Sequence, residues 1–244
     1  MFIKISILVL VLLATLTLTR RFGQESRPGT EASSTSSASA APCQPDIVSS
    51  YVRKLSSRRS EGSQAAISLL NIAKQSAECR ADIVSAVIRA LNNADVEKDD
   101  SAFNVWATGS AILGRLKAVE AVDLLVAHLD LNDGLFSASM VHEPVVLAMV
   151  KMGDVAVPKL ALALKHSPKK RIRLAAAYCL GDIGGSDALD AMKSALNTET
   201  EECVRRFITL TLPSPGISAN ANRPITAADG ELLRQRLLAY TCSN

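Results

Sequence analysis

Cysteine and histidine are the residue types in this chain with the most reactive side chains, and both are spread thinly along it. The five cysteines are Cys43, Cys79, Cys179, Cys203 and Cys242. Thiols form disulfides in exported proteins, and elsewhere they bind metals or act as nucleophiles. Because no C-x-x-C pair occurs, the spacing favours disulfides over a metal or redox motif.

The three histidines, His128, His142 and His166, fall in different segments. A metal site needs three or four ligands that converge, so the sequence predicts no metal site, and we expect no cofactor. The chain also has no Ser/His/Asp grouping, G-x-S-x-G elbow or phosphate-binding loop. We therefore assign no catalytic residue.

Basic side chains form their densest group at Lys169, Lys170 and Arg171. Such a run could bind an acidic partner, so these residues are a candidate binding site. The whole chain has a formal net charge of +3. Four basic and two acidic residues precede residue 32, which leaves the remainder close to neutral. For this reason we expect no nucleic-acid partner.

The first 42 residues have the composition of a targeting and tethering segment. Residues 5–18 are an uncharged apolar run between Lys4 and Arg20. This run suits a signal-peptide core, and the wider stretch 2–19 suits a short membrane anchor, so residues 1–23 are assigned to one or the other. Arg20 and Arg21 would hold the following flank in the cytoplasm. Residues 24–42 are rich in Ser and Ala and are expected to be a flexible linker.

Residues 43–244 are expected to form one all-α domain. Only 4% of the residues are aromatic, so small and aliphatic side chains must fill the core, which favours closely packed helices. Apolar residues recur at helical spacing in the segments 45–58, 60–73, 80–92, 102–116, 119–129, 144–152, 155–165, 171–183, 186–196, 201–212 and 228–240.

A glycine turn divides the most regular stretch, Arg171–Leu196, into two helices. We expect Ser186 or Asp187 to cap the second of them. Residues 111–129 and 148–164 repeat the same plan of an apolar helix end, a short turn and a second helix closing on Leu. The turns lie near residues 117, 153 and 184. A period near thirty predicts a solenoid of stacked antiparallel helix pairs.

The repeat resembles HEAT-like repeats of the phycobilisome-lyase type. The residues that match the pattern R-x-x-A-A-x-x-L-G-x-I-G-x-x-x-A-L are Arg173, Ala176, Ala177, Leu180, Gly181, Ile183, Gly184, Ala188 and Leu189. The resemblance covers residues 100–212 well and residues 45–92 only by general helix pairing. It implies an α-solenoid with a curved surface that usually binds proteins, and it implies no activity.

Another HEAT-like protein, the iron enzyme deoxyhypusine hydroxylase, uses several His-Glu dipeptides. This chain has one, His142-Glu143, which is too few for a di-iron site. The neighbouring loop 132–141 interrupts the period and carries Leu135, Phe136 and Met140. These apolar residues are a second candidate binding site, or they fold back over the hairpin.

Neighbouring ends of antiparallel helices suggest two disulfides. Cys43 starts the first helix and Cys79 is expected to end the second, while Cys203 and Cys242 stand in the same relation at the other end. Cys179 would be a free buried thiol. The alternative is five reduced cytosolic thiols. Bridges Cys43–Cys79 and Cys203–Cys242 would place the domain outside the cytoplasm, in the periplasm or secreted, against the indication from Arg20 and Arg21.

These features favour a non-enzymatic scaffold that binds another protein, is exported, and is tethered to a membrane if residues 1–23 are kept. The alternatives are a lyase-like or repair-like enzyme acting on a ligand or nucleic acid at a basic face, and a structural spacer in the cell envelope.

Overall fold

The computed structural model describes residues 43–57, 59–131 and 143–212. The chain divides into two compact units, residues 1–39 and residues 40–244, and every described residue belongs to the second unit. The predicted signal or anchor segment 1–23 and the predicted linker 24–42 lie outside the described residues. Among the described residues, no helix is long and apolar enough to cross a membrane.

The described residues form helices joined by short turns, with no strand among them. The helices are α2 (Pro45–Arg53), α3 (Arg59–Ala73), α4 (Ala77–Asn93), α5 (Asp100–Arg115), α6 (Val122–Ala127), α7 (Pro144–Met152), α8 (Val157–His166), α9 (Lys170–Ile183), α10 (Gly185–Leu196) and α11 (Glu202–Thr211). Single 3-10 turns are η1 (Lys54–Ser56), η2 (Val119–Ala121) and η4 (Gly153–Ala156).

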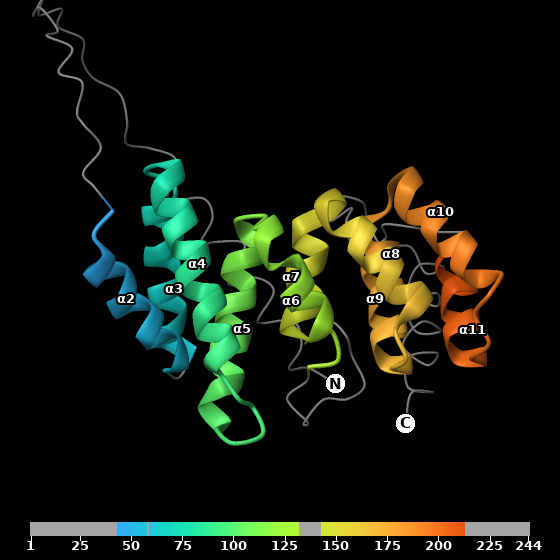
Figure 1. Ribbon diagram of the computed structural model, residues 1–244, viewed down its shortest axis with the longest axis horizontal. Helices are drawn as coiled ribbons and strands as arrows, with labels where there is room; N and C mark the ends of the chain where they lie inside the picture. Colours follow the sequence, from blue (N-terminus) through green and yellow to red (C-terminus); the bar gives the residue numbers. More distant parts are fainter. Residues whose placement is uncertain (1–42, 58, 132–142, 213–244) are drawn as a thin grey trace, which may run out of the picture. The chain divides into compact units, whose positions relative to one another are not determined.

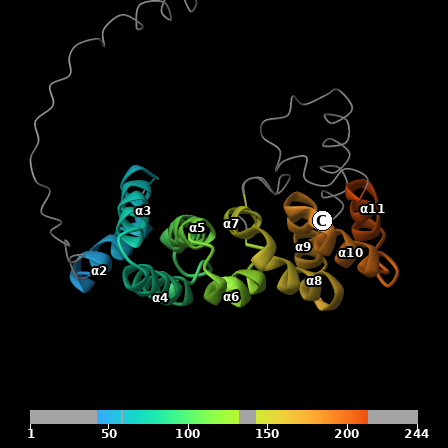
Figure 2. The same ribbon diagram turned by 90° about the horizontal axis from the view of Figure 1, so that it is seen from above.

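The helices of this unit lie in two layers (Figures 1 and 2). One layer holds α3, α5, α7, α9 and α11, each packed on the next, and the other holds α4, α6, α8 and α10. Successive helices alternate between the layers, so each hairpin buries its apolar faces against the hairpins before and after it. The prediction of an all-α solenoid of stacked helix pairs is confirmed.

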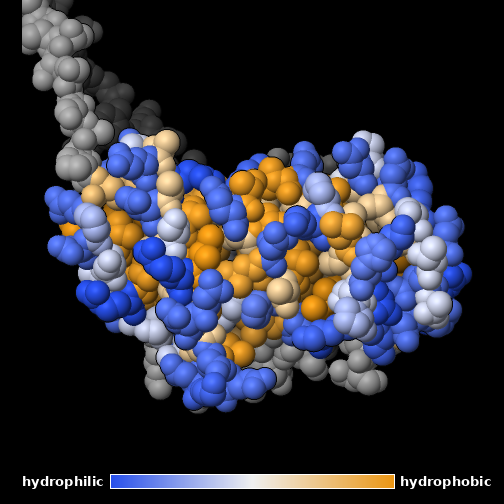
Figure 3. Space-filling model, viewed as in Figure 1, coloured by the Kyte–Doolittle hydropathy of each residue, from blue (hydrophilic) through white to orange (hydrophobic). Residues whose placement is uncertain are grey.

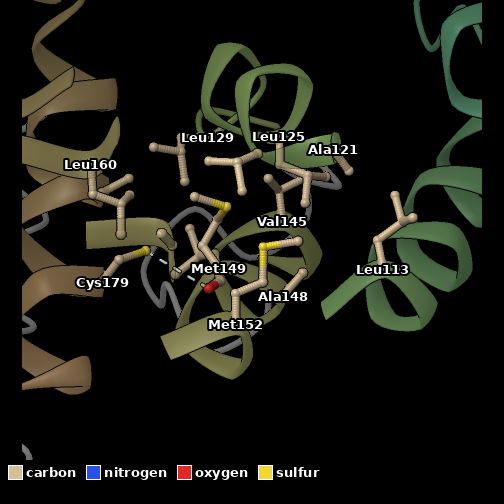
Figure 4. Close-up of a cluster of buried hydrophobic side chains, with 14 of the residues drawn as sticks. Leu113, Ala121, Leu125, Leu129, Val145, Ala148, Met149, Met152, Leu160 and Cys179 are labelled. Carbon is tan, nitrogen blue, oxygen red and sulfur yellow. Dashed lines mark hydrogen bonds between the residues drawn. The ribbon is translucent and has the colours of Figure 1, made fainter. Parts of the chain in front are cut away.

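Each second helix of the repeat buries one stripe with a four-residue spacing. One set is Ala121 at the end of η2, Leu125 in α6 and Leu129 just beyond α6. The equivalent set is Ala156 at the end of η4 with Leu160 and Leu164 in α8, and all six residues are at most 1% exposed. A spacing of four places side chains on one face of a helix. Figure 4 shows this stripe of α6 meeting Val145, Met149 and Met152 of α7.

The turn between the paired helices contains a residue with positive φ in all three repeats. Lys117, Gly153 and Gly184 have φ values of 48°, 69° and 69°. The predicted turn positions are therefore correct. Gly153 and Gly184 combine positive φ with ψ of −140° and −159°, which is a region that essentially only glycine occupies.

Replacing Gly153 with alanine is expected to destabilise the protein by about 1–3 kcal/mol through backbone conformation alone. A Cβ at this position would meet nothing within 4 Å, so no steric clash contributes. The midpoint of urea unfolding, followed by circular dichroism, measures the loss. The matched control is Ala127→Gly, at an exposed site at the end of α6. It exchanges the same two residue types, and the expected loss in the free energy of unfolding is below about 1 kcal/mol.

Several predicted boundaries were wrong. The segment 119–129 is not one helix, because η2 precedes α6 and α6 ends at Ala127. Gly184 is the N-cap of α10 and no side chain caps that helix, so neither Ser186 nor Asp187 does so. Cys79 does not end the second helix: it lies in the first turn of α4, where its N–H donates to the Ser76 side chain at 3.1 Å. A sequence pattern identifies the apolar stripe but not the exact residue at which a helix begins or ends.

Candidate protein-binding surface

The predicted basic site at the start of α9 is largely occupied by ion pairs within the fold. Arg171 donates to Glu143 at 2.5 Å, and Lys169 donates to Asp130 at 2.9 Å. Lys170 is half-buried as the first residue of α9. The Glu143 side chain, only 3% exposed, serves as an acidic partner of Arg171. The basic run therefore has a structural role in joining α9 to the two ends of the α6–α7 connection.

These two ion pairs relate the two sites that the sequence predicted separately. Asp130 comes just before the segment 132–142, and Glu143 comes directly after it. The basic run thus holds both stems of the loop that carries Leu135, Phe136 and Met140. Those three residues and His142 lie outside the described residues, so the role of the loop in binding stays a prediction.

Arg173, two residues further along α9, forms a second enclosed ion pair. Its Nε and Nη2 donate to the two carboxylate oxygens of Glu199 at 2.9 and 3.1 Å, and its Nη1 donates to the Ser167 carbonyl at 2.9 Å. The side chains of Arg173 and Glu199 are 13% and 5% exposed. This fork ties the α8–α9 turn to the α10–α11 turn, because bidentate pairing fixes both position and orientation.

The pKa of Glu199 is lowered from its ordinary value of 4.5. Burial alone would raise this pKa, but hydrogen bonds from Arg173 and from the Glu201 N–H favour the carboxylate and outweigh burial. The resulting stabilisation is complete above the ordinary carboxylate pKa. It is lost as the pH falls from there through the lower native pKa, because the unfolded state then binds more protons.

Wild-type protein is accordingly expected to lose stability between about pH 5 and about pH 3 more steeply than the Glu199→Gln variant. The urea midpoint measured at both pH values gives the slope for each protein. Glu201→Gln, a change at the exposed neighbour of this pair, is expected to keep the wild-type slope. Equal slopes for wild type and Glu199→Gln would contradict the assignment.

The cysteines divide into a contacting pair and a buried thiol. Cys43 and Cys79 are close enough that the interaction between their side chains contributes to raising the pKa of Cys43, and both are thiols in this structure. Cys179 is fully buried and donates to the Val146 carbonyl at 3.7 Å (Figure 4). The prediction of a buried thiol at Cys179 is confirmed. Cys203 lies in the first turn of α11, and Cys242 lies outside the described residues, so their bridge stays a prediction.

Trp106 is a core residue. It is 2% exposed, its Nε1 donates to the Ala94 carbonyl at 3.1 Å, and its ring lies 4.2 Å from that of His128. It therefore offers no exposed surface on which a base could stack. In the part of the chain that the structure describes, no three His, Cys, Asp or Glu side chains are placed to hold a metal ion.

A groove of about 400 Å³ lies between the N-terminal parts of α8 and α10. Small and aliphatic residues line much of it: Val157, Pro158, Ala161, Ala188 and Ala191. The exposed carboxylates of Asp154 and Asp187 stand at its rim, beside the two glycine turns. A groove with this lining can receive apolar side chains of a partner and a basic residue beside them.

Apolar side chains are also exposed on the layer that contains the groove. Val119 of η2, Val155 of η4 and Leu162 of α8 are 55%, 43% and 55% exposed. Figure 3 views this layer and shows hydrophobic surface over its middle, where Figure 1 draws α6 and α8. We name the groove and these three residues the α8–α10 surface. Apolar residues of neighbouring repeats mark this layer as a candidate interface.

The comparisons with known proteins agree with this architecture. Residues 145–212 match the family model for HEAT repeats. The match begins in α7, covers the remaining described helices and supports a HEAT-like repeat family. The searches of curated proteins and of solved structures gave no match. HEAT repeats commonly serve as scaffolds for protein interactions, and the matched segment contains the whole α8–α10 groove.

Sequence reasoning missed the residues of this groove. Asp154 and Asp187 each follow a glycine of the turn by one to three positions, and alanines occupy the facing sides of α8 and α10. That combination was visible in the sequence. The sequence does not give the distance between α8 and α10, because that distance depends on how the two helices pack.

Proposed function

We propose that this protein is a non-enzymatic helical scaffold that binds another protein through the α8–α10 surface. The observation that carries the proposal is the groove itself, because aliphatic residues and two exposed carboxylates line it together. The basic run at Lys169–Arg171, in contrast, is engaged with Asp130 and Glu143. No observation on the described residues favours an enzyme acting at a basic face.

The proposed partner is a protein segment with small apolar side chains and at least one Lys or Arg. The apolar side chains would displace water from the alanine lining, and the cation would lie between Asp154 and Asp187. Rim charges of this kind contribute orientation and association rate more than affinity. We expect a weak, salt-dependent interaction, because exposed charges are screened.

Photo-cross-linking in the source cells tests this surface with the full chain. A photoreactive residue replaces Ala161, which is half-buried in the groove, or Ala107, a half-buried alanine of α5 in the opposite layer. One partner protein is expected to be linked from position 161 and not from position 107. Linkage of the same protein from both positions would contradict a specific surface.

Charge reversal then tests the acidic rim. The double change Asp154→Lys and Asp187→Lys is expected to abolish the cross-link from position 161. The control is Glu97→Lys, which reverses one carboxylate at an exposed residue outside the groove. This variant is expected to keep the cross-link from position 161. Cross-linking that survives the double reversal would show that the rim plays no part, and a pure spacer would yield no specific cross-link at all.

We also propose that the domain is exported and held at a membrane by residues 1–23. The apolar run of residues 5–18 in the sequence supports this location. Protease added to cells whose outer envelope layers have been removed, with the inner membrane intact, is expected to digest the domain. Full protection from the protease, with digestion only after lysis, would overturn export.

Finally, the repeat motif, including the enclosed Arg173, supports assigning the repeats to the phycobilisome-lyase type.

A further inference from the structure

The helix at the start of the described domain is weakly held by packing. In α2 the only buried side chain is that of Val48. This helix contacts α3, η1 and α4, and no described helix precedes it. A terminal helix of a solenoid has neighbours on one side only, and such edges open first.

Two thiols lie at this edge, one just before α2 and one in α4. Cys43 precedes α2 and is half-buried, whereas Cys79 is 1% exposed in the first turn of α4. Because α2 packs on α4, the starts of the two helices bring these side chains close enough to interact. The chain between them contains α2, η1 and α3, so a bond between the sulfurs would close the whole terminal hairpin into a loop.

We propose that Cys43 and Cys79 are an oxidative cross-linking site, at which a disulfide oxidant joins the two sulfurs and locks α2 against α4. This function is separate from partner binding, since the α8–α10 groove lies in other repeats. It concerns the junction at which the folded domain meets the preceding 42 residues.

The reaction is two successive thiol–disulfide exchanges. Cys43, as its thiolate, attacks one sulfur of the oxidant and releases one thiolate. Cys79 then loses its proton and attacks the Cys43 sulfur, which forms the protein disulfide and releases the second thiolate. In total the two cysteines lose two protons and two electrons, and the oxidant disulfide becomes two thiols.

The order of attack follows from exposure. The oxidant can reach the half-buried Cys43 sulfur, whereas Cys79 is covered. Burial, the interaction with Cys79 and nearby acidic groups, including Asp82 and Glu78, raise the pKa of Cys43 to about 11. Little thiolate is present at neutral pH, so formation is slow there and accelerates about tenfold per pH step towards that pKa.

The decisive experiment uses the reduced full chain and oxidised glutathione. After oxidation, remaining thiols are blocked and the protein is digested for mass spectrometry without reduction. A peptide pair linking Cys43 to Cys79 is expected. Cys43→Ser and Cys79→Ser should each abolish it, whereas Cys179→Ser, at the buried thiol of α9, should leave it unchanged.

Hydrogen exchange shows whether the bond holds the edge. Amides of α2 are expected to exchange on the order of 100-fold more slowly in the oxidised protein than in the reduced protein, because the bond limits opening of the terminal hairpin. Amides of α10 should not change. Glutathione attached to Cys43 without closure, a link from Cys43 to another cysteine, or unchanged exchange of α2 would each overturn the proposal.

Discussion

The Arg173→Met variant is expected to unfold with a free energy lower than that of the wild type by about 3–5 kcal/mol. The substitution leaves the Glu199 carboxylate, 5% exposed in the native fold, without its guanidinium partner. It also removes the donor to the Ser167 carbonyl. The free-energy cost of a buried carboxylate without a partner is larger than the stabilisation that the intact ion pair provides.

The matched control is Lys193→Met. Lys193 pairs with Asp190 at 3.1 Å one helix further on, but these side chains are 63% and 72% exposed. Exposed pairs contribute about 0–1 kcal/mol, so this variant should stay close to the wild type. Urea unfolding followed by circular dichroism measures both. A loss below about 1 kcal/mol for Arg173→Met would show that the enclosed pair is not important for stability.

A double variant separates the loss of the ion pair from the cost of leaving the Glu199 carboxylate buried without a partner. Arg173→Met combined with Glu199→Leu is expected to be more stable than Arg173→Met alone, because no buried carboxylate remains. If the double variant were less stable than the single one, the penalty would have to come from lost packing and lost hydrogen bonds.

The second large effect is expected at Gly114, where α5 packs closely on Ala148 of α7. A Cβ on Gly114 would stand 2.8 Å from both the Cα and the carbonyl oxygen of Ala148. Both are backbone atoms, so the two helices themselves must separate. We expect Gly114→Ala to cost about 3 kcal/mol, at the upper end for overpacking, as measured by urea unfolding.

Gly181 provides the contrasting case. A Cβ there would clash with the Cγ2 methyl of Thr211 on α11, while the Thr211 Cβ is 3.6 Å away. The obstacle is therefore one methyl group of a side chain. Thr211→Ser removes that methyl and keeps the hydroxyl that donates to the Phe207 carbonyl at 2.8 Å.

We expect Thr211→Ser to restore most of the stability that Gly181→Ala loses. Ala148→Gly should restore little of the loss from Gly114→Ala, because the backbone contacts of residue 148 remain. Equal rescue at both sites would contradict the distinction between a side-chain obstacle and a backbone obstacle. Non-additivity of this kind is expected only for residues in contact.

The sequence by itself determined the class of fold and its repeat. Apolar spacing fixed the helices because a helix must bury one stripe, as Leu125 and Leu160 do. The turn residues 117, 153 and 184 were recognisable because glycine tolerates backbone conformations that other residues avoid. Lys117 adopts positive φ as well, and there only its place in the repeat identified the turn.

Tertiary structure alone decided the roles of the charged and reactive residues. Lys169 and Arg171 looked like a binding site in the sequence, but their acidic partners lie 39 and 28 residues away. Cys79 contacts Cys43 from the start of α4 and not from the end of the preceding helix. The α8–α10 groove exists because two alanine-lined helices stop short of full contact. Local patterns encode periodicity, whereas pairings across repeats depend on the packing of whole hairpins.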